Sequence, residues 1–144
     1  MTGVLLSIKP KYVREILNGN KQYEFRKQIF RDRSRDMIFI YASSPIKKIV
    51  AYFLLGEIVE GHPDRLWEQF KDVSGVSKED FFDYFSGKEY GFAIKIEELE
   101  QFAEPLDPVA LFEKFVPPQS FCYVDCGDIQ NQITNTMNFC GENS

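Results

Sequence analysis

Apolar positions along the chain cluster, alternate with polar ones or recur every three to four residues, and each pattern predicts a different element. Clusters and alternation predict strands over Val4–Ile8, Gln22–Arg26, Met37–Ala42, Lys48–Glu60, Tyr90–Leu99 and Phe121–Val124. Helical spacing and helix-start signals predict helices over Pro10–Leu17, Pro63–Ser74 and Ser77–Phe85, with a short helical turn over Val109–Phe115. Many short strands with few helices indicate an α+β fold, which we expect to be a small mixed β-barrel, closed or nearly closed, with flanking helices.

The length of 144 residues fits a single domain, which we place at residues 1–124. Residues 125–144 are polar and rich in amides, so we expect a mobile tail or an appendage specific to this protein. No apolar run reaches the ~18 residues of a membrane span. The first residues lack the basic start of a secretory signal. We therefore expect a cytoplasmic protein with no membrane partner.

The three cysteines, Cys122, Cys126 and Cys140, are odd in number and come late in the chain, which favours reduced thiols. A zinc site would need a fourth ligand, and the one histidine, His62, is distant in sequence. No phosphate-binding loop or dinucleotide fingerprint is apparent. The sequence thus predicts neither a metal site nor a cofactor.

Charge is distributed unevenly along the chain. Residues 1–48 hold eleven Lys and Arg against four Asp and Glu, whereas residues 49–144 hold six against eighteen. The first part therefore carries +7 and the second −12, within a total of −5. A cationic face could bind an anionic partner such as RNA, DNA or a nucleotide. Two solvated surfaces of opposite sign would give the same count.

One motif near the start of the chain resembles the opening signature of the ASCH family. It consists of Leu6–Pro10, then Gly19-Asn-Lys21-Gln-Tyr-Glu24-Phe-Arg26. Further similarity lies at Ile40–Pro45, Gly56–Val59, Tyr90–Ile94 and Pro117–Phe121, so the resemblance covers about residues 3–124. It implies a PUA-like barrel with a cleft flanked by helices. Many PUA-like relatives bind RNA or modified bases. Some small ASCH proteins deacetylate N4-acetylcytidine, and another branch has ribonuclease activity.

The residues expected at this cleft are mostly cationic or able to hydrogen-bond a base. They are Lys9, Lys21, Arg26, Lys27, Tyr41, Ser43, Ser44, Tyr90, Gln119 and Ser120. Strand alternation puts Glu24 and Arg26 on one face, within reach of an ion pair. Lys21, Glu24 and Arg26 could instead form an internal network of buried charges. For Tyr41 and Tyr90 the alternative is packing inside the barrel.

If the protein is an enzyme, the candidate catalytic residues are Lys21, Glu24 and Glu57. Glu57 resembles the acidic residue of the amidohydrolase branch. That branch pairs its lysine with a threonine, and Glu24 occupies the matching position here, which argues against acyl transfer through a hydroxyl. We therefore favour a module that binds RNA or a modified nucleotide. The alternative is a hydrolase acting on RNA or on an acylated nucleoside, using Lys21 and Glu57. A third hypothesis is a protein partner bound by the Phe-rich helical insert, residues 63–86.

Overall fold

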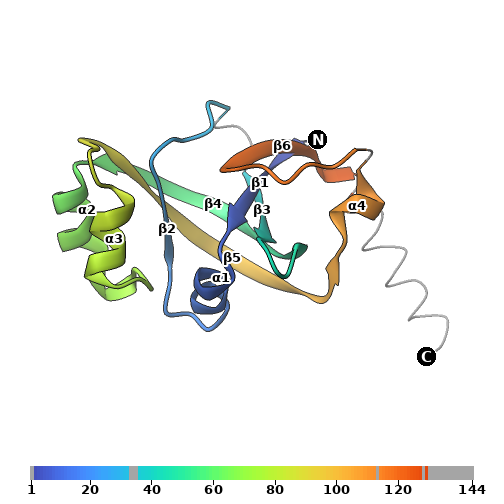
Figure 1. Ribbon diagram of the computed structural model, residues 1–144, viewed down its shortest axis with the longest axis horizontal. Helices are drawn as coiled ribbons and strands as arrows, with labels where there is room; N and C mark the ends of the chain where they lie inside the picture. The colour runs from blue at the N-terminus through green and yellow to red at the C-terminus, as the bar shows by residue number, and fades with distance from the viewer. Residues whose placement is uncertain (1, 33–35, 113, 128, 130–144) are drawn as a thin grey trace.

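Most of the chain folds around one mixed sheet. The computed structural model describes residues 2–32, 36–112, 114–127 and 129. The strands are β1 (Thr2–Ile8), β2 (Tyr23–Arg26), β3 (Met37–Ala42), β4 (Lys48–Gly61), β5 (Gly91–Leu106) and β6 (Phe121–Asp125). The helices are α1 (Pro10–Leu17), α2 (Pro63–Phe70), the 3₁₀ helix η1 (Lys71–Val73), α3 (Lys78–Tyr84) and α4 (Pro108–Leu111). This order confirms the predicted α+β class (Figure 1).

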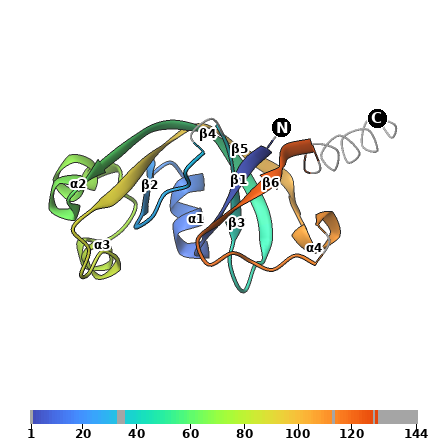
Figure 2. The same ribbon diagram turned by 90° about the horizontal axis from the view of Figure 1, so that it is seen from above.

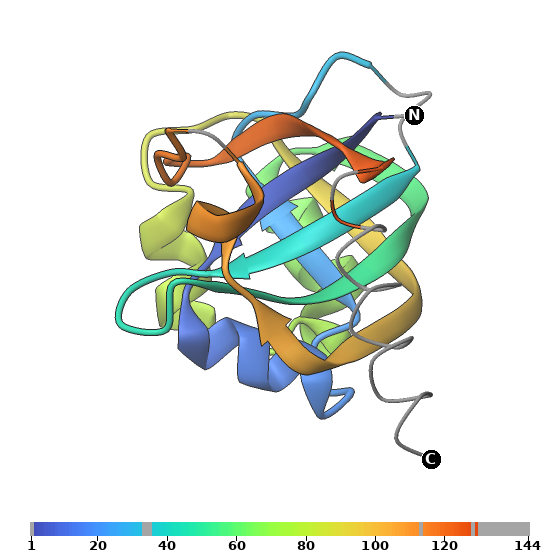
Figure 3. The same ribbon diagram turned by 90° about the vertical axis from the view of Figure 1, so that its right-hand side faces the viewer.

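The six-stranded sheet is open, so the prediction of a closed or nearly closed barrel is wrong. Its strand order is β2-β5-β4-β3-β1-β6. β1 pairs with β3 in parallel, and the other neighbours are antiparallel. The edge strands β2 and β6 pair only with β5 and β1 respectively. β2 has only four residues, so it offers little backbone for closing the sheet. Figure 3 shows β1 between β3 and β6.

A side chain bridges the two edges where a barrel would close. Arg26, the last residue of β2, donates from Nη2 to the carbonyl oxygens of Ser7 and Ser120, at 3.1 and 3.2 Å. Ser7 belongs to β1, and Ser120 immediately precedes β6. Two hydrogen bonds from a guanidinium therefore take the place of the backbone hydrogen bonds that would join these strands in a closed barrel.

Hydrophobic residues pack on both faces of the central strands. In β1, Val4, Leu6 and Ile8 belong to one buried cluster, whereas Leu5 belongs to the cluster on the other face. This explains why β1 reads as a continuous apolar run. α1 begins with Pro10 and buries Val13 and Ile16 against the first cluster.

The helical insert forms a third cluster at one end of the β4–β5 pair. α2 and α3 lie together at that end, and α4 lies at the other (Figure 2). Phe81 of α3 and Phe85, which directly follows this helix, are buried with Leu66 and Phe70 of α2. The hydroxyl of Ser77 accepts a hydrogen bond from the Asp80 amide at 3.0 Å, which confirms the predicted N-cap. The predicted Pro63–Ser74 helix instead changes to a 3₁₀ turn after Phe70.

Residues beyond β6 contribute to the core. Cys126 and Ile129 are buried in the cluster that contains Leu5 and Tyr41. The packed structure therefore reaches past residue 124, where the predicted domain ends. The rest of the predicted tail, residues 130–144, lies outside the described residues. Among the described residues, no helix combines the length and apolar character needed to cross a membrane.

The insert is attached to the start of β2 by a close backbone contact. Lys21 and Ser74 form an isolated antiparallel bridge, and the Gln22 amide donates to the Val73 carbonyl at 2.8 Å. Gly75 has a φ of 63°. A Cβ at this position would overlap the Lys21 side chain and lie 2.9 Å from the Lys21 Cα. Glycine is therefore required twice here, for the left-handed backbone and for the close approach.

We expect Gly75→Ala to destabilise the fold more than Gly87→Ala. Gly87 has a similar φ of 77°, but a Cβ there would meet nothing within 4 Å. Both variants incur the cost of a left-handed alanine, about 1–2 kcal/mol. Steric overlap with Lys21 should add ~1–3 kcal/mol to the loss for Gly75→Ala. Urea unfolding of the two variants measures the difference, and equal losses would contradict the close contact.

Candidate nucleic-acid interface

Three charged side chains are buried at and just before β2. Lys21, Glu24 and Arg26 are only 3%, 6% and 8% exposed. Glu24 lies between the two cations: its Oε1 is 3.4 Å from the Lys21 Nζ, and its Oε2 is 3.6 Å from the Arg26 Nε. Alternation correctly placed Glu24 and Arg26 within reach of each other. These three residues are called the charge network below.

The charge network also binds backbone carbonyls of neighbouring elements. The Lys21 Nζ donates to the Ser74 carbonyl at 3.1 Å and lies 4.6 Å from the centroid of the Phe25 ring. The Arg26 Nε is buried without a hydrogen-bond partner in the described part of the chain, while Nη2 makes the two bonds that bridge the sheet edges. The network therefore joins β2 to the insert, to β1 and to the segment before β6.

Burial lowers the pKa of the Lys21 ammonium, and the nearby Glu24 carboxylate partly offsets this effect. Desolvation penalises the charged form of an amine, whereas an adjacent carboxylate favours it. Lys21 therefore has a larger neutral fraction near pH 7 than an exposed lysine. A neutral amine can accept a proton, so the position is chemically suited to a base.

A cavity of about 770 Å³ lies above the charge network, and it is called the first cavity below. Its walls come from α1, α3, the turn after β3 and the segment before β6. Many residues expected at the cleft line it, namely Lys9, Lys21, Glu24, Arg26, Tyr41, Ser43, Ser44 and Gln119. Residues distant in sequence, from positions 9 to 119, are thus brought together in one place.

Two further predicted residues lie at the margin of the first cavity. The Lys27 amide donates to the Tyr84 hydroxyl at 3.2 Å, and its Nζ is 4.6 Å from the centroid of that ring. Tyr84 itself lines the cavity. Ser120 contributes its carbonyl, which accepts from Arg26.

The remaining two predicted residues lie elsewhere. Tyr90 is 63% exposed just before β5, and Glu57 is exposed on β4. Neither is among the residues that line the first cavity. The structure therefore does not bring Glu57 to Lys21, and Glu24 is the carboxylate beside that amine.

Several lining residues were missed by sequence reasoning, among them Lys11, Tyr12, Lys47, Asp83 and Tyr84. Lys47 has a φ of 55° in the turn between β3 and β4, and its nearness to a Ser-Ser-Pro turn was the available signal. Tyr84 and Asp83 belong to α3. Their sequence gives no sign that this helix faces β2.

The charge around the first cavity is positive. Five lining side chains are cations, Lys9, Lys11, Lys21, Arg26 and Lys47, against three carboxylates, Glu24, Asp80 and Asp83. Lys11 pairs with Asp80 at 3.2 Å. Within the described part of the chain, Lys9 and Lys47 make no ion pair shorter than 4.0 Å. These two ammonium groups are therefore available to an anionic ligand.

Metal ligands do not gather at this site or elsewhere in the described residues. Residues 2–32, 36–112, 114–127 and 129 contain no group of three or more His, Cys, Asp or Glu side chains placed to hold a metal ion. Cys122 is a free thiol. Burial raises the pKa of the Cys122 thiol, which disfavours the thiolate.

The fold and this cavity define an ASCH domain: the family profile matches residues 6–107, and the chain belongs to that family. Among its relatives, the ASCH domain-containing ribonuclease of Zymomonas mobilis is 28% identical over 138 residues, 92% of this chain and 90% of the relative. The crystal structure of ASCH from Zymomonas mobilis has a TM-score of 0.82 and 26% identity, covering 92% and 94% of the two chains. A mutant of that protein gives a TM-score of 0.83 at 25% identity, with the same coverage.

We expect Glu24→Gln to destabilise the protein by about 3–5 kcal/mol, because it leaves two buried cations without their carboxylate. Glu97→Gln is the matched control, since Glu97 is exposed on β5 and pairs with Lys95 at 3.4 Å. Loss of that exposed pair should cost less than ~1 kcal/mol. Urea unfolding of both variants measures the contrast. Similar losses would mean that Glu24 does not compensate the buried charges.

The lowered pKa of Lys21 predicts a pH dependence of stability. The unfolded chain binds the Lys21 proton with the ordinary pKa of 10.5, more tightly than the folded chain does. Between the folded value and 10.5, raising the pH therefore favours the folded state. The free energy of unfolding of the wild type should rise relative to Lys21→Met over this interval and level off above 10.5. A difference that falls with pH would contradict the direction of the shift.

Proposed function

We propose that this protein binds single-stranded RNA, with one nucleotide held in the first cavity. The cavity volume of about 770 Å³ is within the range of ligand sites, ~300–1,000 Å³. Its cations outnumber its carboxylates five to three, so it attracts anions although the whole chain carries −5. This local excess of positive charge around a cavity large enough for a nucleotide is the observation that carries the proposal.

The choice of RNA as the ligand is supported by a relative. The Zymomonas mobilis protein named as a ribonuclease is similar to this chain over nearly its full length. A ribonuclease must first bind RNA, and a related cavity is the natural place for that contact. RNA binding is therefore the property most readily carried from that protein to this one.

The lining side chains suit the parts of a nucleotide. Lys9 and Lys47 have no competing ion pair within 4.0 Å in the described chain, so they would contact phosphate oxygens. Tyr12 and Tyr84 offer aromatic surfaces on which a base can stack. Ser43, Ser44 and Gln119 would hydrogen-bond the base edge or the ribose hydroxyls. The charge network below would hold these walls in position rather than carry the affinity.

RNA cleavage is a second candidate function, favoured by the lowered pKa of Lys21 beside Glu24 and by the name of the relative. The 2′-hydroxyl would lose its proton to the neutral Lys21 amine and form a bond to the adjacent phosphorus. The bond from phosphorus to the 5′ oxygen would break, and that oxygen would take a proton from a lining acid. The products would be a 2′,3′-cyclic phosphate and a 5′-hydroxyl. Lys21 is only 3% exposed, so we place binding before cleavage.

Deacetylation of N4-acetylcytidine gains no support from the site. Glu57 is exposed outside the first cavity, and Glu24 occupies the position of the threonine in that branch. Glu24 also lies between two cations, and a carboxylate offers no hydroxyl nucleophile for that reaction. The reaction stays a prediction that a turnover assay can decide.

We expect the wild type to bind a fluorescently labelled single-stranded RNA with an affinity that falls as salt rises. Lys47→Ala should weaken binding and reduce the slope of log affinity against log salt by about 0.7, the value for one phosphate contact on a single strand. Lys88→Ala is the matched control, because Lys88 is exposed and lines no described cavity. No binding by the wild type, or equal effects of the two variants, would contradict the proposal.

The same samples separate binding from turnover. RNA products that end in a 2′,3′-cyclic phosphate and disappear in a folded Lys21→Met variant would establish cleavage as the function. Intact RNA with binding retained would establish a recognition module. Conversion of N4-acetylcytidine to cytidine would contradict both proposed functions and establish an amidohydrolase.

A further inference from the structure

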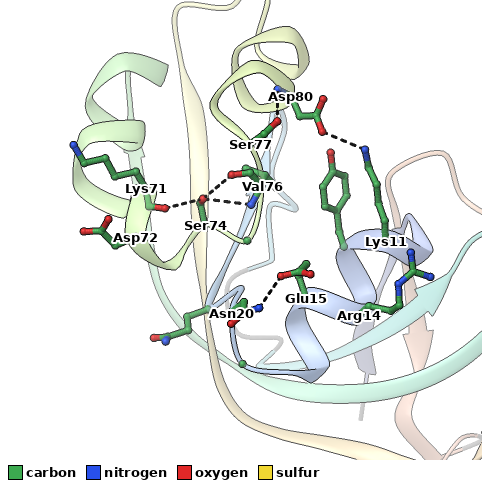
Figure 4. A pocket seen from close by; sticks show the side chains of 14 residues that line it. Lys11, Arg14, Glu15, Asn20, Lys71, Asp72, Ser74, Val76, Ser77 and Asp80 are labelled. Atoms are coloured by element: carbon green, nitrogen blue, oxygen red, sulfur yellow. Dashed lines mark hydrogen bonds and ion pairs between the residues drawn. The ribbon is translucent and has the colours of Figure 1, made fainter.

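A second cavity of about 610 Å³ adjoins the first. One wall is α1, with Lys11, Arg14 and Glu15, and the opposite wall is the segment from η1 to α3, with Lys71, Ser74 and Asp80 (Figure 4). The Lys21–Ser74 bridge described above joins the two sides. None of the functional roles proposed so far uses this cavity.

The two cavities share a boundary formed by an ion pair. Lys11, Tyr12, Val76 and Asp80 line both cavities. The Lys11 ammonium and the Asp80 carboxylate meet at 3.2 Å across the gap between α1 and α3, with half of each side chain exposed (Figure 4). Exposed pairs of this kind contribute little to stability. A ligand phosphate could therefore replace Asp80 as the partner of Lys11 without disturbing the fold.

The second cavity differs from the first in its chemistry. Its three cations, Lys11, Arg14 and Lys71, are balanced by three carboxylates, Glu15, Asp72 and Asp80. It is therefore not a general anion site. It also contains the amides of Asn20 and Gln22. Amide, carboxylate and arginine side chains are the groups that recognise the hydrogen-bonding edges of unstacked bases.

Two of these side chains are available to a ligand. The Asn20 amide already donates to Glu15 at 3.0 Å, whereas the Arg14 and Gln22 side chains form no hydrogen bond or ion pair with other described residues. Both are exposed. An arginine can stack on a base as well as bind it in its plane.

We infer that the second cavity holds the nucleotide next to the one in the first cavity, with the linking phosphate at Lys11. The ligand is then a single-stranded RNA segment of at least two nucleotides, and a base is recognised by Arg14 and Gln22. This inference rests on the proposed function, because it requires RNA in the first cavity. It predicts that affinity depends on ligand length.

The test is a double substitution, Arg14→Ala with Gln22→Ala, compared with Arg65→Ala combined with Gln69→Ala. The control pair removes the same side chains from exposed positions of α2 that line no described cavity. Affinity is measured for a labelled RNA hexamer, and for nucleoside 5′-monophosphates by NMR titration, which detects weak binding. We expect about a tenfold loss of hexamer affinity in the first double variant, no change in the control and unchanged monophosphate binding. Circular dichroism checks that both variants are folded.

The other outcomes distinguish the inference from the proposed function. If the Arg14/Gln22 variant matches its control while Lys47→Ala weakens hexamer binding, RNA binds in the first cavity and the second plays no part. An equal loss for the hexamer and the monophosphates would place Arg14 and Gln22 at the first nucleotide, which also overturns the inference. If the wild type binds no hexamer, or Lys47→Ala has no effect, the proposed function fails and the inference fails with it.

Discussion

The Glu24 side chain, held between Lys21 and Arg26, is the constraint on which the rest of this site depends. Removing three charges from water is costly, and their mutual attraction compensates this cost better when other donors of the two cations also find acceptors. Here those acceptors are the carbonyls of Ser74, Ser7 and Ser120. They belong to the helical insert, to β1 and to the segment before β6. Electrostatic compensation therefore fixes three elements around the short strand β2, and the first cavity lies between them.

This arrangement also explains how an acidic chain can present a cationic site. The buried cations already have partners and stabilise the fold. The rim cations Lys9 and Lys47 have no ion pair in the described chain, so they attract an anionic ligand. Many of the acidic residues lie within the long strands β4 and β5 and the helical insert. The first cavity keeps an excess of cations, five against three, although Asp80 and Asp83 of the acidic insert contribute to its lining.

The sequence predicted local structure well and closure of the sheet badly. Apolar patterning located all the described strands, and β1 and β3 were clear apolar runs because they are buried on both faces. The start of α3 was also predicted, because Ser77 is a clear N-cap. β5 runs on to Leu106 through residues 100–106, where Phe102 is the one strong strand former, so tertiary pairing with β4 was needed to reveal it. Whether a sheet is open or closed depends on whether its two edge strands pair with each other. Local residue patterns do not determine this pairing. The cleft residues near the family motif were found, but Lys47 and Tyr84 depend on tertiary placement.

Photo-crosslinking of a 4-thiouridine-containing single-stranded RNA to the wild-type protein, followed by mass spectrometry of the peptides, tests the central claim most directly. The account predicts crosslinks to peptides that line the first cavity, around Tyr12, around Tyr41 to Lys47, and around Tyr84. Crosslinks confined to the exposed acidic part of β5, or spread evenly over the surface, would contradict it. In that case the buried charges would serve the fold alone.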